Sequence, residues 1–253
     1  MEMQAVTVQP QFGSSSHGGD VLEGLQSLQH VDYIRIKQKI ELCELCSGCE
    51  TKNRYKVYNS QGQVIFTVNE QSNICVRWTC PALRPYDLPV RDRNKREVMS
   101  FHRHGCRFGW CFGCCCREKM TVSAGGVELG YVQQSFTLFR PHFKLCDPEG
   151  NLLFGLQGPC VTCTCGPLCC RTVGFDLQDP SGNKVGMIRK EFSGVVKETM
   201  TDADNFYATM PFQADVKAKA LVLAAVFLLD QVYFENKTDP EPDPGPEDPE
   251  PAD

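Results

Sequence analysis

Alternating apolar and polar positions dominate the middle of the chain. Five segments share one plan, in which two alternating stretches flank a turn rich in Asp, Asn, Pro, Ser and Gly: 55–68, 87–101, 120–132, 142–156 and 174–188. Alternation places every second side chain on one face of a strand, and Asp-Pro followed by Gly favours a tight turn with a positive φ. The pattern predicts five β-hairpins and, with flanking strands, an all-β antiparallel fold.

A closed barrel accommodates so many strands best, because closure leaves no strand edge exposed. Residues 215–235 break the alternation, since they contain no turn residue and are apolar on all sides, which predicts a buried helix. Only Ala220 to Leu229 separate Lys219 from Asp230. Ten helical residues cover about 15 Å, half of a ~30 Å hydrocarbon layer. We favour a helix through the middle of the barrel over the alternative of a single membrane span.

The sequence divides into three parts by composition. Residues 1–20 are rich in Gly, Ser and Gln and are expected to be disordered, 21–236 form the barrel domain with its central helix at 216–235, and 237–253 form an acidic, Pro-rich, disordered tail. Residues 238–253 carry seven acids and no base, whereas the rest of the chain holds 26 basic and 24 acidic residues. Such a tail typically solubilises a protein, and its Pro-x-x-Pro spacing also suits protein partners that bind proline-rich segments.

Sixteen cysteines lie between Cys43 and Cys170. The first twenty residues contain no apolar stretch typical of a secretory signal, so we expect a reducing compartment rather than secretion. In that setting the thiols are expected to be buried apolar side chains, metal ligands or acylation sites rather than disulfides.

Six segments of the sequence carry a resemblance to a known family: Gly24-Leu25, KQKIELCELCSGCETKNRYKVYNSQGQ, CFGCCC (111–116), GPCVTCTCG (158–166), TDADNFYATMPFQADVKAKA (201–220) and FLLDQVYFE. Together, over about residues 22–235, they resemble the phospholipid scramblase family. The resemblance implies a Tubby-like barrel of about twelve strands around a central C-terminal helix. It also implies calcium-responsive, ATP-independent, bidirectional movement of phospholipids between leaflets, with anchoring by palmitate.

The cysteine run GWCFGCCCREK corresponds to the family's acylated run, and its thiols are Cys111, Cys114, Cys115 and Cys116. Residues 91–119 hold eight basic and three acidic residues, with aromatic residues between them. Basic charge and aromatic rings favour an anionic membrane surface, and several acyl chains anchor stably. We therefore expect palmitoylation here, at the cytoplasmic face of a membrane.

Two alternatives for the cysteines stay open. Cys-x₂-Cys spacing occurs at 43–49, 111–114 and 160–163, and two such pairs could hold zinc in a tetrahedral thiolate site. The other alternative is a set of buried thiols. In the family the acylated run is denser and contains a proline, whereas Phe112-Gly113 interrupts it here.

A calcium loop over residues 202–213 is also implied by the resemblance. The six ligand positions of an EF-hand would fall on Asp202, Asp204, Phe206, Ala208, Met210 and Gln213. Only two of these are carboxylates, so we expect an affinity no better than about 10⁻⁴–10⁻³ M. The alternative is the start of a strand, with Asp202 capping a turn.

Other functional classes find little support. With a pI of 5.6 and one local basic patch, nucleic-acid binding is not expected. The sequence has no glycine-flanked nucleophile, phosphate-binding loop or HExxH motif, so we do not expect an enzyme.

A barrel that buries its only apolar helix offers no polar groove across a bilayer. Scrambling would then require a spanning helix, local membrane disruption or a homo-oligomer, and the competing hypothesis is a palmitoylated module that binds lipids or proteins without transporting lipid.

Overall fold

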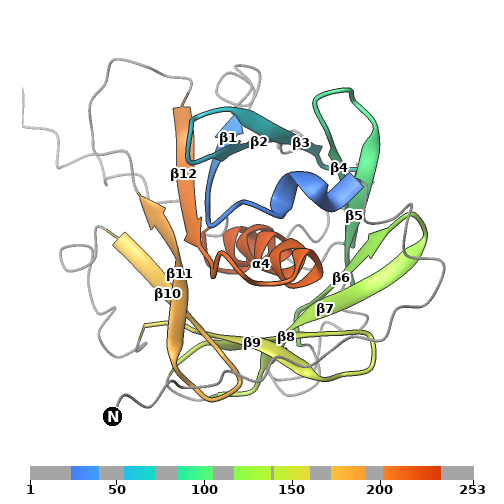
Figure 1. Cartoon of the computed structure of the whole chain (residues 1–253). Helices are drawn as coiled ribbons and strands as arrows, with labels where there is room; N and C mark the ends of the chain where they lie inside the picture. Colours follow the sequence, from blue (N-terminus) through green and yellow to red (C-terminus); the bar gives the residue numbers. More distant parts are fainter. Residues whose placement is uncertain are drawn as a thin grey trace, which may run out of the picture.

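A computed structural model describes residues 24–39, 54–71, 85–104, 117–137, 140–159, 172–191 and 202–234. Twelve antiparallel strands follow one another around a closed barrel, and pairing of the first strand with the last closes it. Figure 1 looks down the barrel and shows the helix α4 at its centre. The prediction of a closed all-β barrel around a C-terminal helix is confirmed.

The five hairpins predicted from the alternating pattern are the strand pairs β2–β3, β4–β5, β6–β7, β8–β9 and β10–β11. The strands are β1 Tyr33–Lys39, β2 Arg54–Asn59, β3 Val64–Asn69, β4 Tyr86–Arg91, β5 Glu97–Arg103, β6 Lys119–Ala124, β7 Val127–Ser135, β8 His142–Cys146, β9 Leu152–Gln157, β10 Thr172–Gln178, β11 Lys184–Glu191 and β12 Asp202–Thr209. The helical elements are η1 Gln26–Leu28, α4 Val216–Leu229 and the π-helical turn η4 Asp230–Phe234.

Four of the hairpins use the same turn. Its first residue is Asn59, Asp92, Asp147 or Asp179, whose Oδ1 accepts the backbone N–H four residues later at 2.7–2.9 Å. The carbonyl of the same residue accepts the N–H three residues later, and the next strand then begins. The residue at that third step has a positive φ in all four turns: Gly62, Lys95, Gly150 and Gly182. This combination of a type I turn and a left-handed residue fits the right-handed twist of the strands.

Substitution of Gly182 by Ala tests this turn. Gly182 has φ +87° with open space around it, so Ala would meet no atom but would have to adopt a disfavoured backbone conformation. We expect Gly182→Ala to lower the free energy of unfolding by about 1 kcal/mol. The matched control is Gly174→Ala in β10, where φ is not positive and the nearest atom to a Cβ would lie 3.9 Å away. Equal urea midpoints for the two variants would contradict the assignment.

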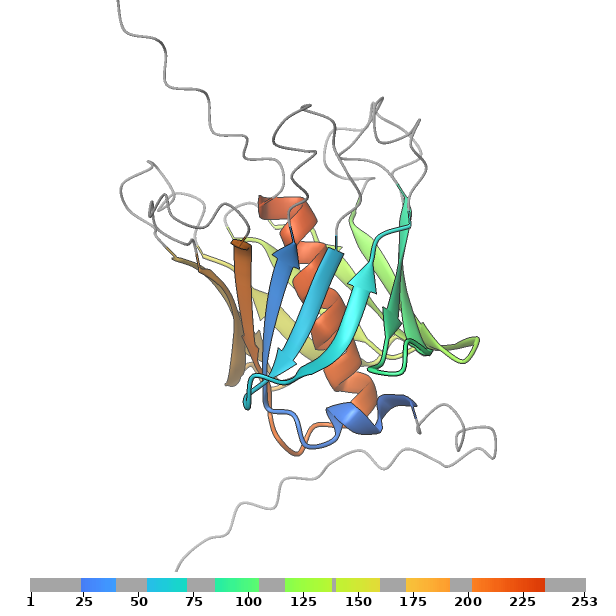
Figure 2. The ribbon, with the colours of Figure 1, turned by 90° about the horizontal axis from the view of Figure 1, so that it is seen from above.

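The two ends of the barrel differ in their connections. Short turns join the strands of each hairpin at one end, which we call the tight-turn end. At the other end, the long-loop end, the connections are longer: 40–53, 70–85, 104–118, 136–141, 158–171 and 192–201. Figure 2 shows α4 running along the barrel, with η1 near its first turn at the tight-turn end. The chain therefore leaves the barrel at the long-loop end after η4.

Helix α4 fills the interior of the barrel. Every residue from Ala218 to Leu229 is buried, and inward side chains of the strands surround them, including Phe66, Phe101 and Phe143. A helix that is apolar on all sides is stable only where all its sides are covered, which the closed barrel provides. Nowhere in the described ranges is a helix both long enough and apolar enough for a membrane span.

One lysine is buried with the helix at the tight-turn end. Lys219 is 0% exposed, and its Nζ donates hydrogen bonds to the carbonyl oxygens of Gln29 and Phe212, each at 2.8 Å. Burial lowers the pKa of this lysine from its ordinary value. The two bonds connect the first turn of α4 to the segments before β1 and after β12, so they fix the depth of the helix in the barrel.

Candidate functional site

The cysteines gather at one end of the barrel through the topology of the chain. Fifteen of the sixteen lie in four of the connections at the long-loop end, 40–53, 70–85, 104–118 and 158–171. The exception is Cys146 at the end of β8, which is buried, and burial raises the pKa of its thiol. Any acylation or metal binding by these fifteen cysteines would therefore take place at the long-loop end.

A partly buried ion pair closes the base of the connection that carries the predicted acylation sites. Arg103 is the last residue of β5 and Glu118 directly precedes β6, and their side chains form two hydrogen bonds of 2.8 and 2.9 Å. The backbone N–H of His104 donates to the carbonyl of Lys119 at 3.0 Å. Bidentate guanidinium–carboxylate pairing is directional as well as strong, so it holds the two ends of this connection in one geometry.

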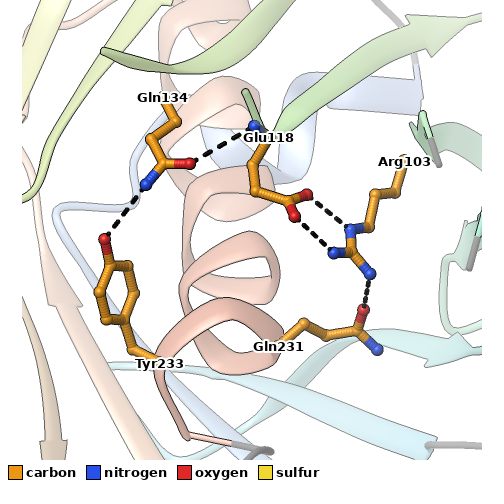
Figure 3. A network of polar contacts seen from close by, with 5 residues as sticks. All are labelled: Arg103, Glu118, Gln134, Gln231 and Tyr233. Carbon is orange, nitrogen blue, oxygen red and sulfur yellow. Dashed lines mark hydrogen bonds and ion pairs between the residues drawn. The ribbon is translucent and has the colours of Figure 1, made fainter. Parts of the chain in front are cut away.

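The same ion pair contacts the end of the central helix. Arg103 Nη1 donates to Oε1 of Gln231 in η4 at 3.0 Å, and the Arg103 guanidinium lies 5.6 Å from the ring centre of Tyr86. Figure 3 shows the ion pair and its bond to Gln231, together with a second contact in which Gln134 Nε2 donates to the hydroxyl of Tyr233 at 3.4 Å. The backbone N–H of Glu118 joins the two by donating to Oε1 of Gln134, also at 3.4 Å. The helix end, β5, β6 and β7 therefore share one polar network.

The helix changes from α to π geometry where this network begins. Asp230 is the first residue of η4 and is 3% exposed, and its Oδ2 accepts a hydrogen bond from the hydroxyl of Tyr55 at 2.9 Å. Burial raises the pKa of Tyr233, whose ring packs against Phe143 and Phe175. The π-helix is rare in proteins and occurs mostly as single turns, frequently at functional sites. Here the partners of Asp230 and Gln231 lie on strands.

The four cysteines predicted to be acylated lie outside the described residues. Cys111, Cys114, Cys115 and Cys116 belong to the stretch between the two ends that Arg103 and Glu118 hold. The Cys-x₂-Cys pairs of the zinc alternative also fall outside the described ranges. The structure thus shows where the connection with the cysteine run joins the barrel, and the acylation of these cysteines stays a prediction.

The residues of the predicted calcium loop lie along a strand of the barrel wall. Residues 202–209 form β12, which pairs with β1 on one side and β11 on the other. An eight-residue strand is about 23 Å long. Phe206, Ala208 and Met210 are buried, and Gln213 is exposed in the turn before α4. Asp202 and Asp204 begin the strand at the long-loop end, so the structure does not gather the six positions around one point.

Clustered metal-ligating side chains are not found in the part of the chain that the structure describes. Within the described ranges no three His, Cys, Asp or Glu side chains group closely enough to hold a metal ion. What this part of the site provides is a rigid base of strand ends and a helix end.

Sequence reasoning missed two buried charged residues near the long-loop end, Arg103 and Lys190. Arg103 shares the inward alternation of Met99 and Phe101, and Lys190 shares that of Ile188, so both occupy positions at which an apolar residue is expected. These two residues could have been found in the sequence, because each is charged at a position where the alternation of its strand predicts an inward apolar side chain. Lys190 is 2% exposed, and its Nζ lies 5.2 Å from the ring centre of Phe206.

Comparison with known proteins decides the family. The model of the Scramblase family matches residues 16–236, which include every described residue. The chain belongs to the Scramblase family. Among its curated relatives, phospholipid scramblase 1 of Rattus norvegicus is 39% identical over 217 residues, 85% of this chain and 64% of the relative.

Further scramblase relatives show the same extent of similarity. Phospholipid scramblase 1 of Mus musculus is 38% identical over 84% of this chain and 64% of its own length, and phospholipid scramblase 2 of Bos taurus is 36% identical over 84% of this chain and 71% of its own. The chain therefore spans less than two thirds of the length of the rat and mouse proteins. No solved structure matches this Scramblase chain. The resemblance found in the sequence is confirmed.

Proposed function

We propose that the chain moves phospholipids between the two leaflets of a membrane, in both directions and without ATP. The observation that carries this proposal is the 36–39% identity, over more than four fifths of the chain, to proteins named phospholipid scramblases. The chain would then act as a lipid transporter and not as an enzyme. Its substrates would be membrane phospholipids.

The connection 104–118 is the part proposed to attach the chain to a membrane, at the cytoplasmic face. Cys111, Cys114, Cys115 and Cys116 would carry palmitate there, because several acyl chains together anchor a protein stably. The ion pair between Arg103 and Glu118 supports this proposal by fixing both ends of the connection. Anchored in this way, the barrel would stay at the membrane surface during many lipid movements.

The path of the lipid would run outside the barrel. Side chains of α4 and the strands fill its interior, which leaves no place for a headgroup between them. Lipids would therefore cross along the outer wall, in bilayer disturbed by the bound protein, or between copies of the chain.

Calcium is proposed as a low-affinity activator. Its carboxylate ligands would be Asp202 and Asp204, which follow the connection 192–201 and begin β12 at the long-loop end. Two carboxylates bind calcium weakly, with a dissociation constant of about 10⁻⁴–10⁻³ M. The other four positions of the resemblance, Phe206, Ala208, Met210 and Gln213, would supply at most backbone oxygens.

The calcium proposal is tested with labelled lipid in reconstituted vesicles. We expect millimolar calcium to speed the loss of labelled lipid from one leaflet, and Asp202→Asn/Asp204→Asn to abolish that increase. The matched control is Glu97→Gln/Glu149→Gln, which removes two exposed carboxylates at the tight-turn end. An equal calcium response in both double variants would rule out these ligands.

The anchoring proposal is tested by acyl–biotin exchange on protein expressed in cells. Replacement of all four cysteines by Ala should remove most of the incorporated label and shift the chain from membranes to the soluble fraction. One zinc ion per purified molecule, lost in the same variant, would instead support the thiolate alternative and contradict acylation.

A second candidate function rests on the filled barrel. An anchored barrel whose interior is occupied could bind lipid headgroups or proteins, including partners of the proline-rich acidic tail, without moving lipid. The exchange measurement that closes the Discussion separates this module from a scramblase.

A further inference from the structure

Two arginines and several tyrosines line the outer wall of the barrel where its first and last strands meet. We call the outward side chains of Tyr33, Arg35, Lys56, Tyr58, Arg189 and Tyr207 the arginine–tyrosine wall. Strand pairing places Arg35 of β1 and Arg189 of β11 directly opposite Tyr207 of β12, one on each side. In the next row, Lys56 of β2 lies opposite Lys37 of β1. Arg35 and Arg189 therefore flank the ring of Tyr207, and Lys37 and Lys56 extend the basic charge across β1 and β2.

The wall contains a shallow hollow with an aromatic floor. It has a volume of about 290 Å³ and is lined by Tyr33, Met187, Arg189, Tyr207 and Thr209. The rings of Tyr33 and Tyr207 lie 6.1 Å apart at an angle of 38°. Phenolic rings are amphipathic and concentrate at the boundary between lipid and water.

The guanidinium groups beside the hollow lack carboxylate partners among the described side chains. Arg35 lies 6.0 Å from the ring centre of Tyr207, and its buried Nε has no hydrogen-bond partner within the described ranges. Arg189 is exposed, and its Nη2 contacts only the thioether of Met187, at 3.0 Å, which is a weak acceptor. A buried donor without an acceptor is costly unless a ligand or water supplies one.

The carboxylate of Asp176 on β10, the strand next to β11, pairs with Lys184 at 2.6 Å rather than with an arginine of the wall. The Oδ1 of Asn205 on β12 is also buried without a hydrogen-bond partner among the described atoms, so this wall still has an unused acceptor. Guanidinium groups recognise phosphate through paired hydrogen bonds, which favours a phosphate-bearing ligand over a carboxylate of the chain itself.

We propose that the arginine–tyrosine wall is the face that lies against an anionic membrane, with phospholipid phosphates bound between Arg35 and Arg189 over the ring of Tyr207. This inference rests on the proposed function, which places the chain at a membrane. What it adds is the face of the barrel that contacts that membrane. The wall runs from the tight-turn end toward the long-loop end, so a barrel docked on it would lie on its side. The proposed outer path of the lipid would then begin at this wall.

Binding of the full chain to vesicles tests the proposal. On phosphatidylcholine vesicles containing phosphatidylserine, we expect Arg35→Gln/Arg189→Gln to weaken binding about 30-fold, as two basic residues near an anionic surface predict. The matched control is Arg140→Gln/Lys144→Gln, which removes the same charge around β8, on the opposite side of the barrel in Figure 1. Both double variants should keep the urea midpoint of the wild type. Equal weakening in the two would overturn the proposal.

Quenching by brominated lipids tests the orientation. The tryptophan of Tyr207→Trp should be quenched by brominated acyl chains, whereas that of Tyr131→Trp should not. Both substitutions are made in the variant Trp78→Phe/Trp110→Phe, because the chain has two tryptophans of its own. Tyr131 is a fair control because it also faces outward, has a cation nearby in Lys119, 4.2 Å from its ring centre, and lies on β7 across the barrel. Equal or stronger quenching at Tyr131 would contradict the proposed face.

The outcomes separate this inference from the proposed function. If vesicle binding depends on the two arginines but no lipid is exchanged, the membrane-facing role of the wall is supported and the scrambling proposal is overturned. If lipid is exchanged but binding does not depend on the two arginines, the role of the wall is overturned and the scrambling proposal is supported. If the acidic tail occupied the wall, ending the chain at Lys237 would strengthen vesicle binding, while the arginine pair would not matter in the full chain, and this result would also overturn the proposal.

Discussion

Phe227→Ala should lower the free energy of unfolding by about 3–5 kcal/mol, the loss typical of a fully buried aromatic ring. Phe227 lies in the middle of the barrel and is 1% exposed. Its ring packs edge-on against Tyr55, with centres 4.9 Å apart, and lies 5.8 Å from Phe101. The variant would leave a cavity between α4 and the strands β2 and β5, which carry Tyr55 and Phe101. Tyr55 would also lose the packing that positions its hydroxyl for the hydrogen bond to Asp230.

Urea unfolding followed by circular dichroism measures this loss. The matched control is Phe136→Ala, since Phe136 is 59% exposed after β7 and its truncation should change the free energy of unfolding by less than about 0.5 kcal/mol. Similar losses in the two variants would contradict the burial of α4 inside the barrel.

Arg103→Met should cost about 3 kcal/mol, because it leaves the Glu118 carboxylate at the barrel end without its partner. The side chains of Arg103 and Glu118 are 4% and 19% exposed, so water replaces the lost bonds only in part. Gln231 loses a donor in the same change, which also loosens η4.

Two comparisons make the Arg103 result specific. Arg96→Met removes an exposed arginine that pairs with Asp92 in a turn, and surface pairs of this kind contribute about 0–1 kcal/mol. The double variant Arg103→Met/Glu118→Leu should recover part of the loss, because it removes both charges together. A double variant no more stable than Arg103→Met would show that the charge of Glu118 is not the cause.

Local sequence determines much of this fold, which is why the strands could be predicted. Each hairpin turn forms within five residues, so Asp147 and Gly150 reveal it without knowledge of the rest of the chain. The central helix was equally visible as an uninterrupted apolar stretch, although its last turn becomes π-helical from Asp230 onward. Lys95 was less predictable, since it adopts the positive φ that the other three turns assign to glycine.

Contacts between distant residues were beyond local reasoning. The partners Arg103 and Gln231 are 128 positions apart, and only closure of the barrel around α4 brings them together. The arginine–tyrosine wall depends in the same way on closure, because β1 and β12 are adjacent only in the closed barrel. For residues 202–213, the family pattern predicted a calcium loop and the start of a strand was the alternative, and residues 202–209 form a strand in which Phe206 and Ala208 are buried.

The most direct test of the account is lipid exchange by the full chain in vesicles, measured in both directions without ATP. Fluorescent phosphatidylcholine or phosphatidylserine would be placed in one leaflet, and a membrane-impermeant reductant would report its arrival in the other. We predict inward and outward rates that are equal to each other and well above those of vesicles without protein. Rates no higher than those of empty vesicles, from a chain that retains cooperative unfolding and vesicle binding, would contradict scrambling and leave an anchored, lipid-binding barrel.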